Sequence, residues 1–213
     1  MDEPSSPPEC KDAPSFHRNI EPITKHLQNI LPETPADLLE VGSGTGQHAA
    51  SLSGTFPNLT FWPSEYAEGN VASIDAWARH FNRSNVRPAR QLDATSDDWR
   101  NTGTEMLPEM FAAITCFNVI HISPWEVTEG LFRGASRLLA GDGHLILYGA
   151  YRINGEQVSE SNVEFEKWLK SIDERNAVRD IGDVEAVANK NGLILKDFHP
   201  MPANNFMPVF VRG

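Results

Sequence analysis

The sequence predicts an α/β fold in which helices cover both faces of a doubly wound, mostly parallel β-sheet. Three observations lead to this prediction. Apolar stretches of strand length alternate along the chain with stretches in which apolar residues recur at helical spacing. One of them, residues 112–120, is apolar almost throughout, as in a central strand covered on both faces. A glycine-rich turn follows the first expected strand, where folds of this kind bind ligands.

The glycine-rich turn carries the strongest functional signal. Gly42, Gly44 and Gly46 separate an apolar strand, residues 37–41, from a helix expected to run to about residue 54. Glycine lets the chain turn sharply and lets its amides approach a ligand, while the helix start presents unpaired N–H groups. A dinucleotide site would place its third glycine at position 47, which is Gln47. The spacing therefore disfavours NAD.

The acid before this turn points to a different cofactor. Glu40 suits a ligand that carries an amino group and repels a phosphate. S-adenosylmethionine (SAM) has an amino group and no phosphate. We therefore predict SAM as the cofactor, held by the end of the strand, the turn and the helix start, which contain Glu40, Gly42, Ser43, Gly44, Gly46, Gln47 and His48.

Acidic residues follow the next two expected strands. Before residue 94 the pattern further predicts helices over residues 20–31 and 74–81 and strands over 59–62 and 87–92. Glu65 comes just after the first of these strands, and its carboxylate suits the two hydroxyls of a ribose. Asp93 closes the second, where it suits the adenine amino group or only caps a turn.

The second half of the chain continues the alternation. Beyond residue 120 the pattern predicts a helix over 126–139 ending in an Ala-Gly-Asp-Gly turn, a strand over 144–151, a helix over 184–191, and strands over 193–198 and 207–212. We expect the last two strands to form an antiparallel hairpin at the sheet edge. Because the carboxyl ends of parallel strands meet at one edge, Asn118 is expected to join the cofactor site.

Composition narrows the class of protein. The formal net charge of −11 repels a phosphate backbone, so we favour a small-molecule acceptor over a nucleic acid. Cys10 and Cys116 lie in unlike settings, which disfavours a disulfide framework, and we expect no metal site. The acidic, proline-rich start differs from a secretory signal, and no apolar stretch approaches eighteen residues. We therefore predict a cytoplasmic protein without a membrane span.

The start of the chain differs in composition from the rest. Residues 1–14 carry four prolines and no hydrophobic periodicity, which predicts a disordered leader. Residues 15–213 are expected to form a single SAM-binding domain.

Several motifs together resemble a known family. They are Arg18-Asn-Ile-Glu-Pro-Ile23, Ser43-Gly-Thr-Gly-Gln-His-Ala49, Trp62-Pro-Ser-Glu65, Asn118-Val-Ile-His-Ile-Ser-Pro-Trp125, Glu129-Gly-Leu-Phe-Arg133, Ser161-Asn-Val-Glu-Phe165, Arg179-Asp180 and Met201-Pro-Ala-Asn-Asn205. In this order they resemble the small class I SAM-dependent methyltransferase-like proteins typified by methyltransferase-like protein 26. The resemblance implies a Rossmann-like methyltransferase domain with seven strands in the order 3-2-1-4-5-7-6, and a SAM site. It implies no particular methyl acceptor.

Further site residues follow from position in this architecture. His121 lies after the buried strand, where an imidazole could deprotonate an acceptor, and Tyr151 is the second catalytic candidate. A structural His121, hydrogen-bonded to the Ser123-Pro124 turn, is the alternative. The candidates for holding the acceptor are polar or aromatic residues expected near the same strand ends, namely Trp125, Tyr148, Asn162, Arg179, Asn204 and Asn205.

The segment before the first strand is a candidate lid. Arg18 and Asn19 belong to a motif of the family yet lie outside the expected sheet, just before the expected helix. We expect both to contact the cofactor, Arg18 by pairing with the carboxylate of SAM. The alternative is that this segment only covers a sheet edge.

These expectations add up to a SAM-dependent methyltransferase that acts on a small molecule. Methyl transfer depends mostly on aligning acceptor and methyl group, so the lack of a recognisable catalytic triad does not count against it. Two alternatives remain. SAM could itself be cyclised or cleaved, releasing methylthioadenosine, or the protein could bind SAM and act only through interactions with other molecules.

Overall fold

The structure is a computed structural model, and it describes residues 7–213. Its contacts group into two compact units. The first unit comprises the chain up to Asp93 together with Arg100–Pro108, and the second comprises Ala94–Trp99 together with Glu109–Gly213. The expectation of one domain over residues 15–213 stays a prediction.

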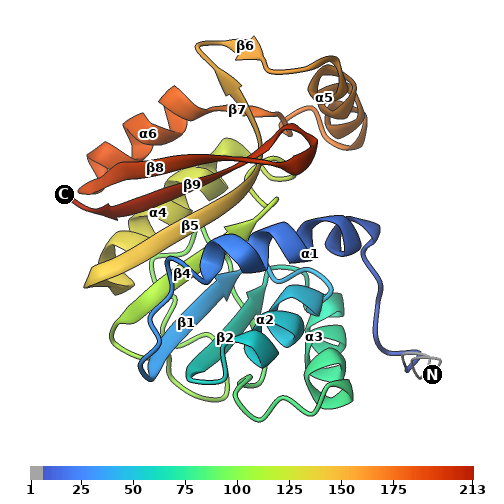
Figure 1. The fold of residues 1–213 in the computed structure, drawn as a ribbon, viewed down its shortest axis with the longest axis vertical. Coiled ribbons are helices and arrows are strands. Elements are labelled where there is room, and N and C mark those ends of the chain that lie inside the picture. The colour runs from blue at the N-terminus through green and yellow to red at the C-terminus, as the bar shows by residue number, and fades with distance from the viewer. Residues whose placement is uncertain (1–6) are drawn as a thin grey trace. The chain divides into compact units, whose positions relative to one another are not determined.

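The first unit alternates helices and parallel strands (Figure 1). Its elements are α1 (Pro14–Leu27), β1 (Ala36–Val41), α2 (Gln47–Thr55), β2 (Leu59–Glu65), α3 (Glu68–His80) and β3 (Arg90–Gln91). The strands lie in the order β3-β2-β1, with all pairs parallel. Because β1 and β2 run in register from Ala36 opposite Leu59 to Val41 opposite Ser64, the turn after β1 lies beside the end of β2.

Helix α1 begins six residues earlier than the apolar pattern predicts. A proline at a first helical position has a suitable φ angle and no N–H to leave unpaired, and Pro14 occupies that place. The helix buries Asn19, Ile23 and Leu27, which lie four residues apart on one face. Arg18 and Asn19 are therefore inside the helix, and the expectation that they precede it is wrong.

The segment before α1 is ordered where the structure describes it. Residues 1–6 of the predicted leader lie outside the described residues. Cys10 is buried among Ala50, Ala76 and Trp77 of the first unit, and residues 11–13 form hydrogen bonds with α2 and α3. The prediction of disorder is therefore wrong for residues 10–13, because their backbone groups find partners that a pattern of apolar residues does not reveal.

The second unit combines parallel and antiparallel strands. Its elements are β4 (Phe111–Phe117), α4 (Trp125–Leu138), β5 (Leu139–Ile153), β6 (Glu156–Gln157), α5 (Glu160–Ile172), β7 (Arg179–Asp180), α6 (Ile181–Lys190), β8 (Leu193–Met201), a 3-10 turn η1 (Pro202–Asn204) and β9 (Asn205–Arg212). The strands follow the order β4-β5-β9-β8, and β6 and β7 pair only with the end of β5. Figure 1 shows β5, β9 and β8 side by side. The antiparallel hairpin at the sheet edge is confirmed.

Among the described residues, leaving β6 and β7 aside, three strands belong to the first unit and four to the second. Counted in this way, β8 is the sixth strand and β9 the seventh. The orders β3-β2-β1 and β4-β5-β9-β8 then correspond to 3-2-1 and 4-5-7-6, and each agrees with the order that the family resemblance implies. The central apolar run forms β4, which is fully buried over Ala113–Phe117. The alternation of strands with helices was thus predicted correctly.

Two elements of the second unit differ from the prediction. The expected Ala-Gly-Asp-Gly turn is part of β5: Phe111 pairs with Leu139 and Ala113 with His144, so β5 accommodates the extra residues in a bulge. Helix α5 was not predicted at all. Its start is marked by Ser159, whose hydroxyl accepts a hydrogen bond from the N–H of Asn162.

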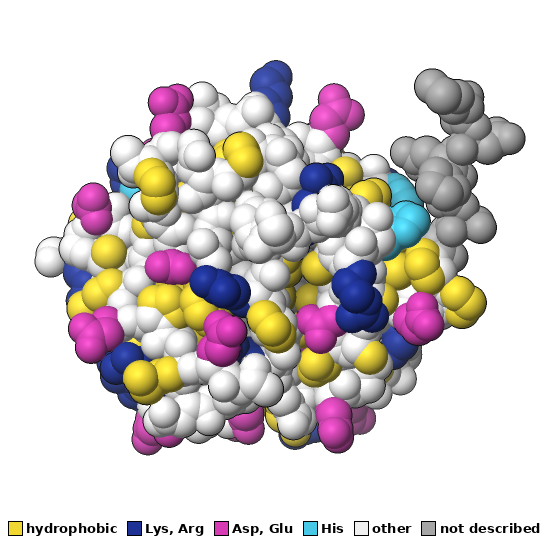
Figure 2. Space-filling model, turned by 90° about the horizontal axis from the view of Figure 1, so that it is seen from below, with side chains coloured by type: hydrophobic (Ala, Val, Ile, Leu, Met, Phe, Trp, Pro, Cys, Tyr) yellow, Lys and Arg dark blue, Asp and Glu magenta, His cyan; other side chains and the backbone are white. Residues whose placement is uncertain are grey.

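Two further expectations concern membranes and nucleic acids. No helix in the described part is long and apolar enough to cross a membrane. On the face shown in Figure 2, lysine and arginine side chains are separated by acidic and hydrophobic ones. That face presents no continuous basic surface of the kind that nucleic-acid binding uses.

Candidate functional site

The turn between β1 and α2 holds three left-handed glycines. Their φ angles are 74° at Gly42, 57° at Gly44 and 93° at Gly46. A Cβ atom at Gly46 would lie 2.4 Å from the Cα atom of Ile74 in α3, so only glycine fits there. A Cβ atom at Gly44 would meet nothing within 4 Å. The turn is therefore packed on one side and open at Gly44, as a turn that cradles a ligand must be.

The carboxylate of Glu65 faces this open turn. One oxygen, Oε2, accepts a hydrogen bond of 2.7 Å from the N–H of Gly44, and Oε1 accepts one of 3.1 Å from the N–H of Ala67. The backbone N–H of Ser43 donates to the carbonyl of Ser64 at 2.8 Å, which fixes the turn against the end of β2. Each carboxylate oxygen keeps a further lone pair for a ligand hydroxyl. This position fits the ribose contact expected of Glu65.

Glu40 is a buried acid next to the same turn. Its residue is 3% exposed, and Oε2 has no hydrogen-bond partner among the described residues. Burial, reinforced by the charge of Glu65, raises the pKa of Glu40 to about 7, although Ser43 opposes the shift. A buried carboxylate without a partner suits a cation, and the ammonium group of a bound ligand would supply one. The residues at this turn therefore fit SAM.

The side chains of Gln47 and His48 contact other residues of the protein. The side-chain oxygen of Gln47 accepts hydrogen bonds from the N–H of Ala13 at 2.7 Å and the hydroxyl of Thr45 at 3.0 Å. Its amide nitrogen donates to Asp12 at 2.8 Å. Burial lowers the pKa of His48 to about 4, and its ring lies edge-on to Phe16. Both side chains shape the turn, and a direct contact with the cofactor stays a prediction for each.

The remaining cofactor candidates of the first unit lie at its surface or in its helices. Arg18 is exposed and donates a hydrogen bond of 3.3 Å to the carbonyl of Pro14. Asn19 is buried on the inner face of α1, and Asp93 is exposed just beyond β3. The cofactor contacts of these three side chains stay predictions.

The second unit brings the two predicted catalytic residues together. The rings of His121 and Tyr151 meet edge-on with centroids 5.3 Å apart, and both residues are fully buried. Neither ring nitrogen of His121 nor the hydroxyl of Tyr151 has a hydrogen-bond partner among the described residues. His121 lies so close to the backbone that a Cβ atom at Gly149 would be 2.1 Å from its Nε2 atom. Three polar atoms are thus enclosed without partners, which is costly unless a ligand or water pairs with them.

The surroundings of His121 keep it neutral. Burial, followed by the positive charge of Arg179, lowers the pKa of His121 to about 3, although the backbone of Ala177 beside the ring opposes the shift. Burial also raises the pKa of Tyr151 well above 10. The hydroxyl of Ser123 donates to the carbonyl of Val119 at 2.8 Å, and a structural role for His121 stays the alternative. A neutral imidazole retains the lone pair that a general base needs.

Arg179 holds the loop that carries His121. Its Nε atom donates to the carbonyl of Ile120 at 2.9 Å and its Nη2 atom to that of Ser123 at 2.6 Å. The guanidinium also lies over the ring of Trp125, 5.5 Å from its centroid. Both Arg179 and Trp125 line a hollow of about 640 Å³ in the second unit. The two predicted acceptor residues are therefore neighbours, and Arg179 has the additional role of fixing the loop after β4.

Three predicted asparagines converge near the start of α5. The side chain of Asn162 donates to the carbonyl of Asn204 at 3.3 Å, and that of Asn204 donates to the hydroxyl of Ser161 at 3.2 Å. Asn205 donates to the carbonyl of Pro202 at 3.2 Å. Tyr148 does not join them: it lies in β5 rather than in a loop and is buried against Phe117. Asn118, the last cofactor candidate, has a left-handed backbone and donates its N–H to the carbonyl of Tyr148 at 2.8 Å.

The structure also reveals an ionic group around the buried Glu166 that the sequence did not predict. Glu166 in α5 accepts hydrogen bonds from Arg152 and from the side chain of Gln157. Lys170, one turn further along the helix, lies 3.5 Å from its second oxygen. Arg152 and Glu166 both line the 640 Å³ hollow. The sequence carried one signal for this group, the spacing of four residues between Glu166 and Lys170, which pairs side chains only if the segment is helical.

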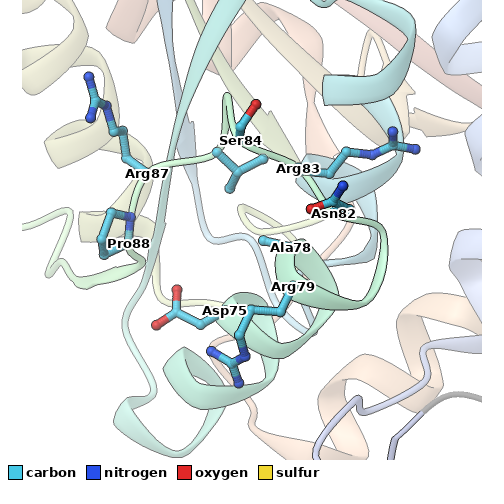
Figure 3. Close-up of a pocket in the computed structure, with 9 residues that line it drawn as sticks. Asp75, Ala78, Arg79, Asn82, Arg83, Ser84, Arg87 and Pro88 are labelled. Carbon is cyan, nitrogen blue, oxygen red and sulfur yellow. The ribbon is translucent and has the colours of Figure 1, made fainter.

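A second hollow, of about 340 Å³, lies in the first unit at the end of α3 and in the loop after it (Figure 3). Its lining includes Arg79, Arg83 and Arg87. Figure 3 shows the guanidinium groups of Arg83 and Arg87 pointing in different directions. Arg83 donates to the carbonyl of Ala50, and Arg87 lies over the ring of Trp62. The arginines therefore do not converge on a common anion position.

Metal chemistry was not expected from the sequence. Within residues 7–213, no three His, Cys, Asp or Glu side chains come together in a way that could hold a metal ion.

The chain matches one family model and is similar in structure to several methyltransferases. A family model described as "Protein of unknown function (DUF938)" matches residues 10–212. The SAH-bound form of CalO1, a methyltransferase in calicheamicin biosynthesis, is similar over 93% of this chain and 55% of its own, with a TM-score of 0.72 and 15% identity. An O-methyltransferase family protein from Burkholderia thailandensis is similar over 93% and 57%, with a TM-score of 0.76 and 11% identity. An O-methyltransferase family 2 protein from Planctomyces limnophilus, in complex with apigenin, is similar over 93% and 60%, with a TM-score of 0.75 and 15% identity.

These likenesses establish the fold. The protein has the α/β Rossmann-like fold of the methyltransferases, as the sequence predicts. The chain spans little more than half the length of the structures it matches.

Proposed function

The chain belongs to the DUF938 family, and we propose that it is a SAM-dependent methyltransferase that acts on a small-molecule acceptor. The observation that carries the proposal is the glycine turn after β1, which is open at Gly44 and flanked by the carboxylates of Glu65 and Glu40. The finer resemblance to the proteins typified by methyltransferase-like protein 26 is part of the proposal, as is a location in the cytoplasm.

The first unit would hold the cofactor. Glu65 would accept hydrogen bonds from the ribose hydroxyls, and Glu40 would pair with the ammonium group. The open side of Gly44 leaves room for the ligand to approach the backbone. When bound, SAM supplies an electrophilic methyl group. Asp93, Arg18 and Asn19 are the other cofactor contacts that we propose within this unit, and the cofactor contact of Asn118, a residue of the second unit, stays a prediction.

The second unit would receive the acceptor. His121 would accept the proton that the acceptor loses on methylation, once access to the acceptor relieves the burial that lowers the pKa of the imidazole. Tyr151 would orient the acceptor through its unpartnered hydroxyl. Because both side chains are fully buried, access requires a local opening of the second unit.

The acceptor class follows from charge and from the structural neighbours. The net charge of −11 disfavours nucleic acid. One neighbour is described as a methyltransferase in calicheamicin biosynthesis and another as a mitomycin 7-O-methyltransferase. These descriptions support a small organic acceptor, methylated on oxygen, for this chain as well.

Calorimetry and product analysis test the proposal. Titrations of the purified protein with SAM, S-adenosylhomocysteine and NAD should show binding of the two sulfur nucleosides and none of NAD. Binding of NAD alone would contradict the proposal. Incubation with SAM and a panel of phenolic and hydroxylated acceptors should then release S-adenosylhomocysteine. Release of methylthioadenosine would indicate that SAM itself is cyclised or cleaved, and binding without any product would indicate a non-catalytic SAM-binding protein.

A further inference from the structure

The four residues before α1, Cys10–Ala13, are attached to the glycine turn. We call this segment the brace. Its hydrogen bonds reach residues that lie 34 to 66 positions away in the sequence. They fall into three groups, which involve Gln47, Ser73 and the body of α3.

The first group joins the brace to the turn through Gln47. The side-chain oxygen of Gln47 accepts the N–H of Ala13 at 2.7 Å and also the hydroxyl of Thr45 at 3.0 Å. Its nitrogen donates to the carboxylate of Asp12 at 2.8 Å. Gln47 is 2% exposed, whereas its partner Asp12 lies at the surface, so the bonds of this amide are partly buried. A single buried amide thus connects the brace to the side chain of Thr45.

The second group joins the brace to the same residue of the turn through Ser73. The hydroxyl of Ser73 accepts the N–H of Lys11 at 2.9 Å and donates to the carbonyl of Thr45 at 2.8 Å. Ser73 is 1% exposed and lies in α3. Both ends of Thr45, hydroxyl and carbonyl, are therefore linked to the brace by one intervening side chain.

The third group anchors the brace itself. The Nζ atom of Lys11 donates to the carbonyl of Gly69 at 2.7 Å and to the side chain of Asn70 at 2.8 Å. The indole of Trp77 donates to the carbonyl of Lys11 at 2.8 Å, and the buried Cys10 packs against the same ring system. The brace is thus held on α3 at both its backbone and its side chains.

Thr45 stands between Gly44 and Gly46, and its position explains why such links matter. A turn with three left-handed glycines loses more conformational entropy on ordering than a turn of the same length without glycine. If only the ordered form of the turn binds a ligand, the observed dissociation constant equals the intrinsic one divided by the fraction of the protein in which the turn is ordered. Contacts that hold Thr45 raise the ordered fraction before any ligand arrives.

We propose that the brace, acting through Gln47 and Ser73, preorganises the glycine turn for its ligand, so that Ser73 and residues 11–13 are positioning residues of the cofactor site. For the identity of that ligand, SAM, the inference rests on the proposed function. The ordering of the turn itself does not depend on it.

A matched pair of serine substitutions tests the inference. Ser73→Ala removes both links through that hydroxyl. Ser53→Ala is the control, because Ser53 is equally buried at 1% but its hydroxyl donates only to Ala50 within α2. Hydrogen exchange of the ligand-free protein should be faster at residues 43–46 in Ser73→Ala than in Ser53→Ala, with unchanged exchange in β1 and β2. Affinity for S-adenosylhomocysteine should fall about five- to tenfold in Ser73→Ala alone.

A pair of truncations tests the brace directly. Removal of residues 1–9 leaves the brace intact and should not change affinity for S-adenosylhomocysteine. Removal of residues 1–13 should weaken it about tenfold or more, since it also deletes the partners of Gln47.

The outcomes separate this inference from the proposed function. If the wild-type protein binds no sulfur nucleoside, the proposed function fails, while hydrogen exchange still judges the brace. If wild type binds but the Ser73→Ala protein matches the Ser53→Ala control in exchange and affinity, the brace has only a structural role and the inference is overturned. Equal affinity of the two truncated proteins, both folded by circular dichroism, would overturn it as well.

Discussion

The open side of the glycine turn of the first unit, where Glu65 lies, and the His121 region of the second unit place their polar groups in opposite ways. At the turn, backbone N–H groups and the carboxylate of Glu65 are paired with one another around an open position at Gly44. Around His121, three polar atoms are enclosed without partners. Polar groups that are already paired around an open position can bind a ligand without rearrangement. Polar atoms that are enclosed without partners destabilise the folded protein, and a ligand or a local opening that supplies partners removes this destabilisation. Cofactor binding and reaction should therefore respond to different perturbations.

The largest effect is expected where the turn is packed rather than open. Gly46→Ala places a Cβ atom 2.4 Å from the backbone of Ile74 at a φ of 93°, so the free energy of unfolding should fall by about 3 kcal/mol or more. Gly44→Ala meets no neighbour and should cost only about 1 kcal/mol, from its left-handed backbone. It should still weaken cofactor binding. Denaturant unfolding and calorimetry check both. A Gly46→Ala protein as stable as Gly44→Ala would contradict the packing argument.

The buried acid beside the turn should make stability fall as pH rises. The folded pKa of Glu40, about 7, is raised above its unfolded value of 4.5. Its contribution to stability is therefore fully present below pH 4.5 and is lost as pH rises to about 7, a change on the order of 3 kcal/mol. Glu40→Gln should remove this component, which is measured as the difference between the two proteins in unfolding at several pH values. Parallel pH dependences of the two proteins would rule it out.

The same group links pH to cofactor affinity in the opposite direction. In the proposed site the ammonium group of SAM would pair with ionised Glu40, so affinity for SAM should fall as pH drops below about 7, approaching tenfold per pH unit. Calorimetry on wild type and Glu40→Gln compares the two slopes, and the variant should bind weakly at every pH.

The buried base of the second unit should make stability fall as pH drops. The folded pKa of His121, about 3, lies below its unfolded value of 6.5. Its contribution is therefore present above pH 6.5 and is lost as pH falls toward 3, by about 2 kcal/mol between pH 7 and pH 5. His121→Asn should flatten this part of the profile, whatever it does to overall stability. A slope that persists in the variant would assign the acid sensitivity elsewhere.

The smallest effect is expected at the open side of the turn. Glu65→Ala should weaken binding of S-adenosylhomocysteine about tenfold, because charge-assisted hydrogen bonds to the ribose are lost. Its stability should change little, since Glu65 is partly exposed and only its bonds to Gly44 and Ala67 disappear. Calorimetry with a circular dichroism control measures both. Unchanged affinity in a folded variant would move the ribose contact to another residue.

Local chemistry was enough to predict the elements that position the site. Gly46 is required by its left-handed backbone, and the spacing that pointed away from a dinucleotide was visible in the chain. The apolar run that became β4 was equally clear. Helix α5 escaped prediction because its inner face buries Asn162 and Glu166 beside Leu169, so the apolar period that signals a helix is interrupted by polar residues.

The pattern of apolar residues in the sequence indicated neither the contacts of the brace nor the burial of two tyrosines. The brace could not be found, since its contacts join residues 10–13 to residues 45, 47 and 73 through hydrogen bonds that leave no periodicity. The burial of Tyr148 and Tyr151 was also missed, because a tyrosine at the end of a strand has the same sequence signal whether its hydroxyl faces water or the core.

The sequence by itself determined the α/β fold, the alternation of helices and strands up to β5 and the glycine turn with its acids, because these depend on local backbone preferences and on the period of apolar residues. Only the tertiary structure decided which polar atoms are paired. It assigned Gln47 and Ser73 to the brace, left Glu40 and His121 buried without partners, and thereby moved the pKa values of the last two in opposite senses. Pairing and desolvation depend on groups that are distant in the chain, and no local pattern encodes them.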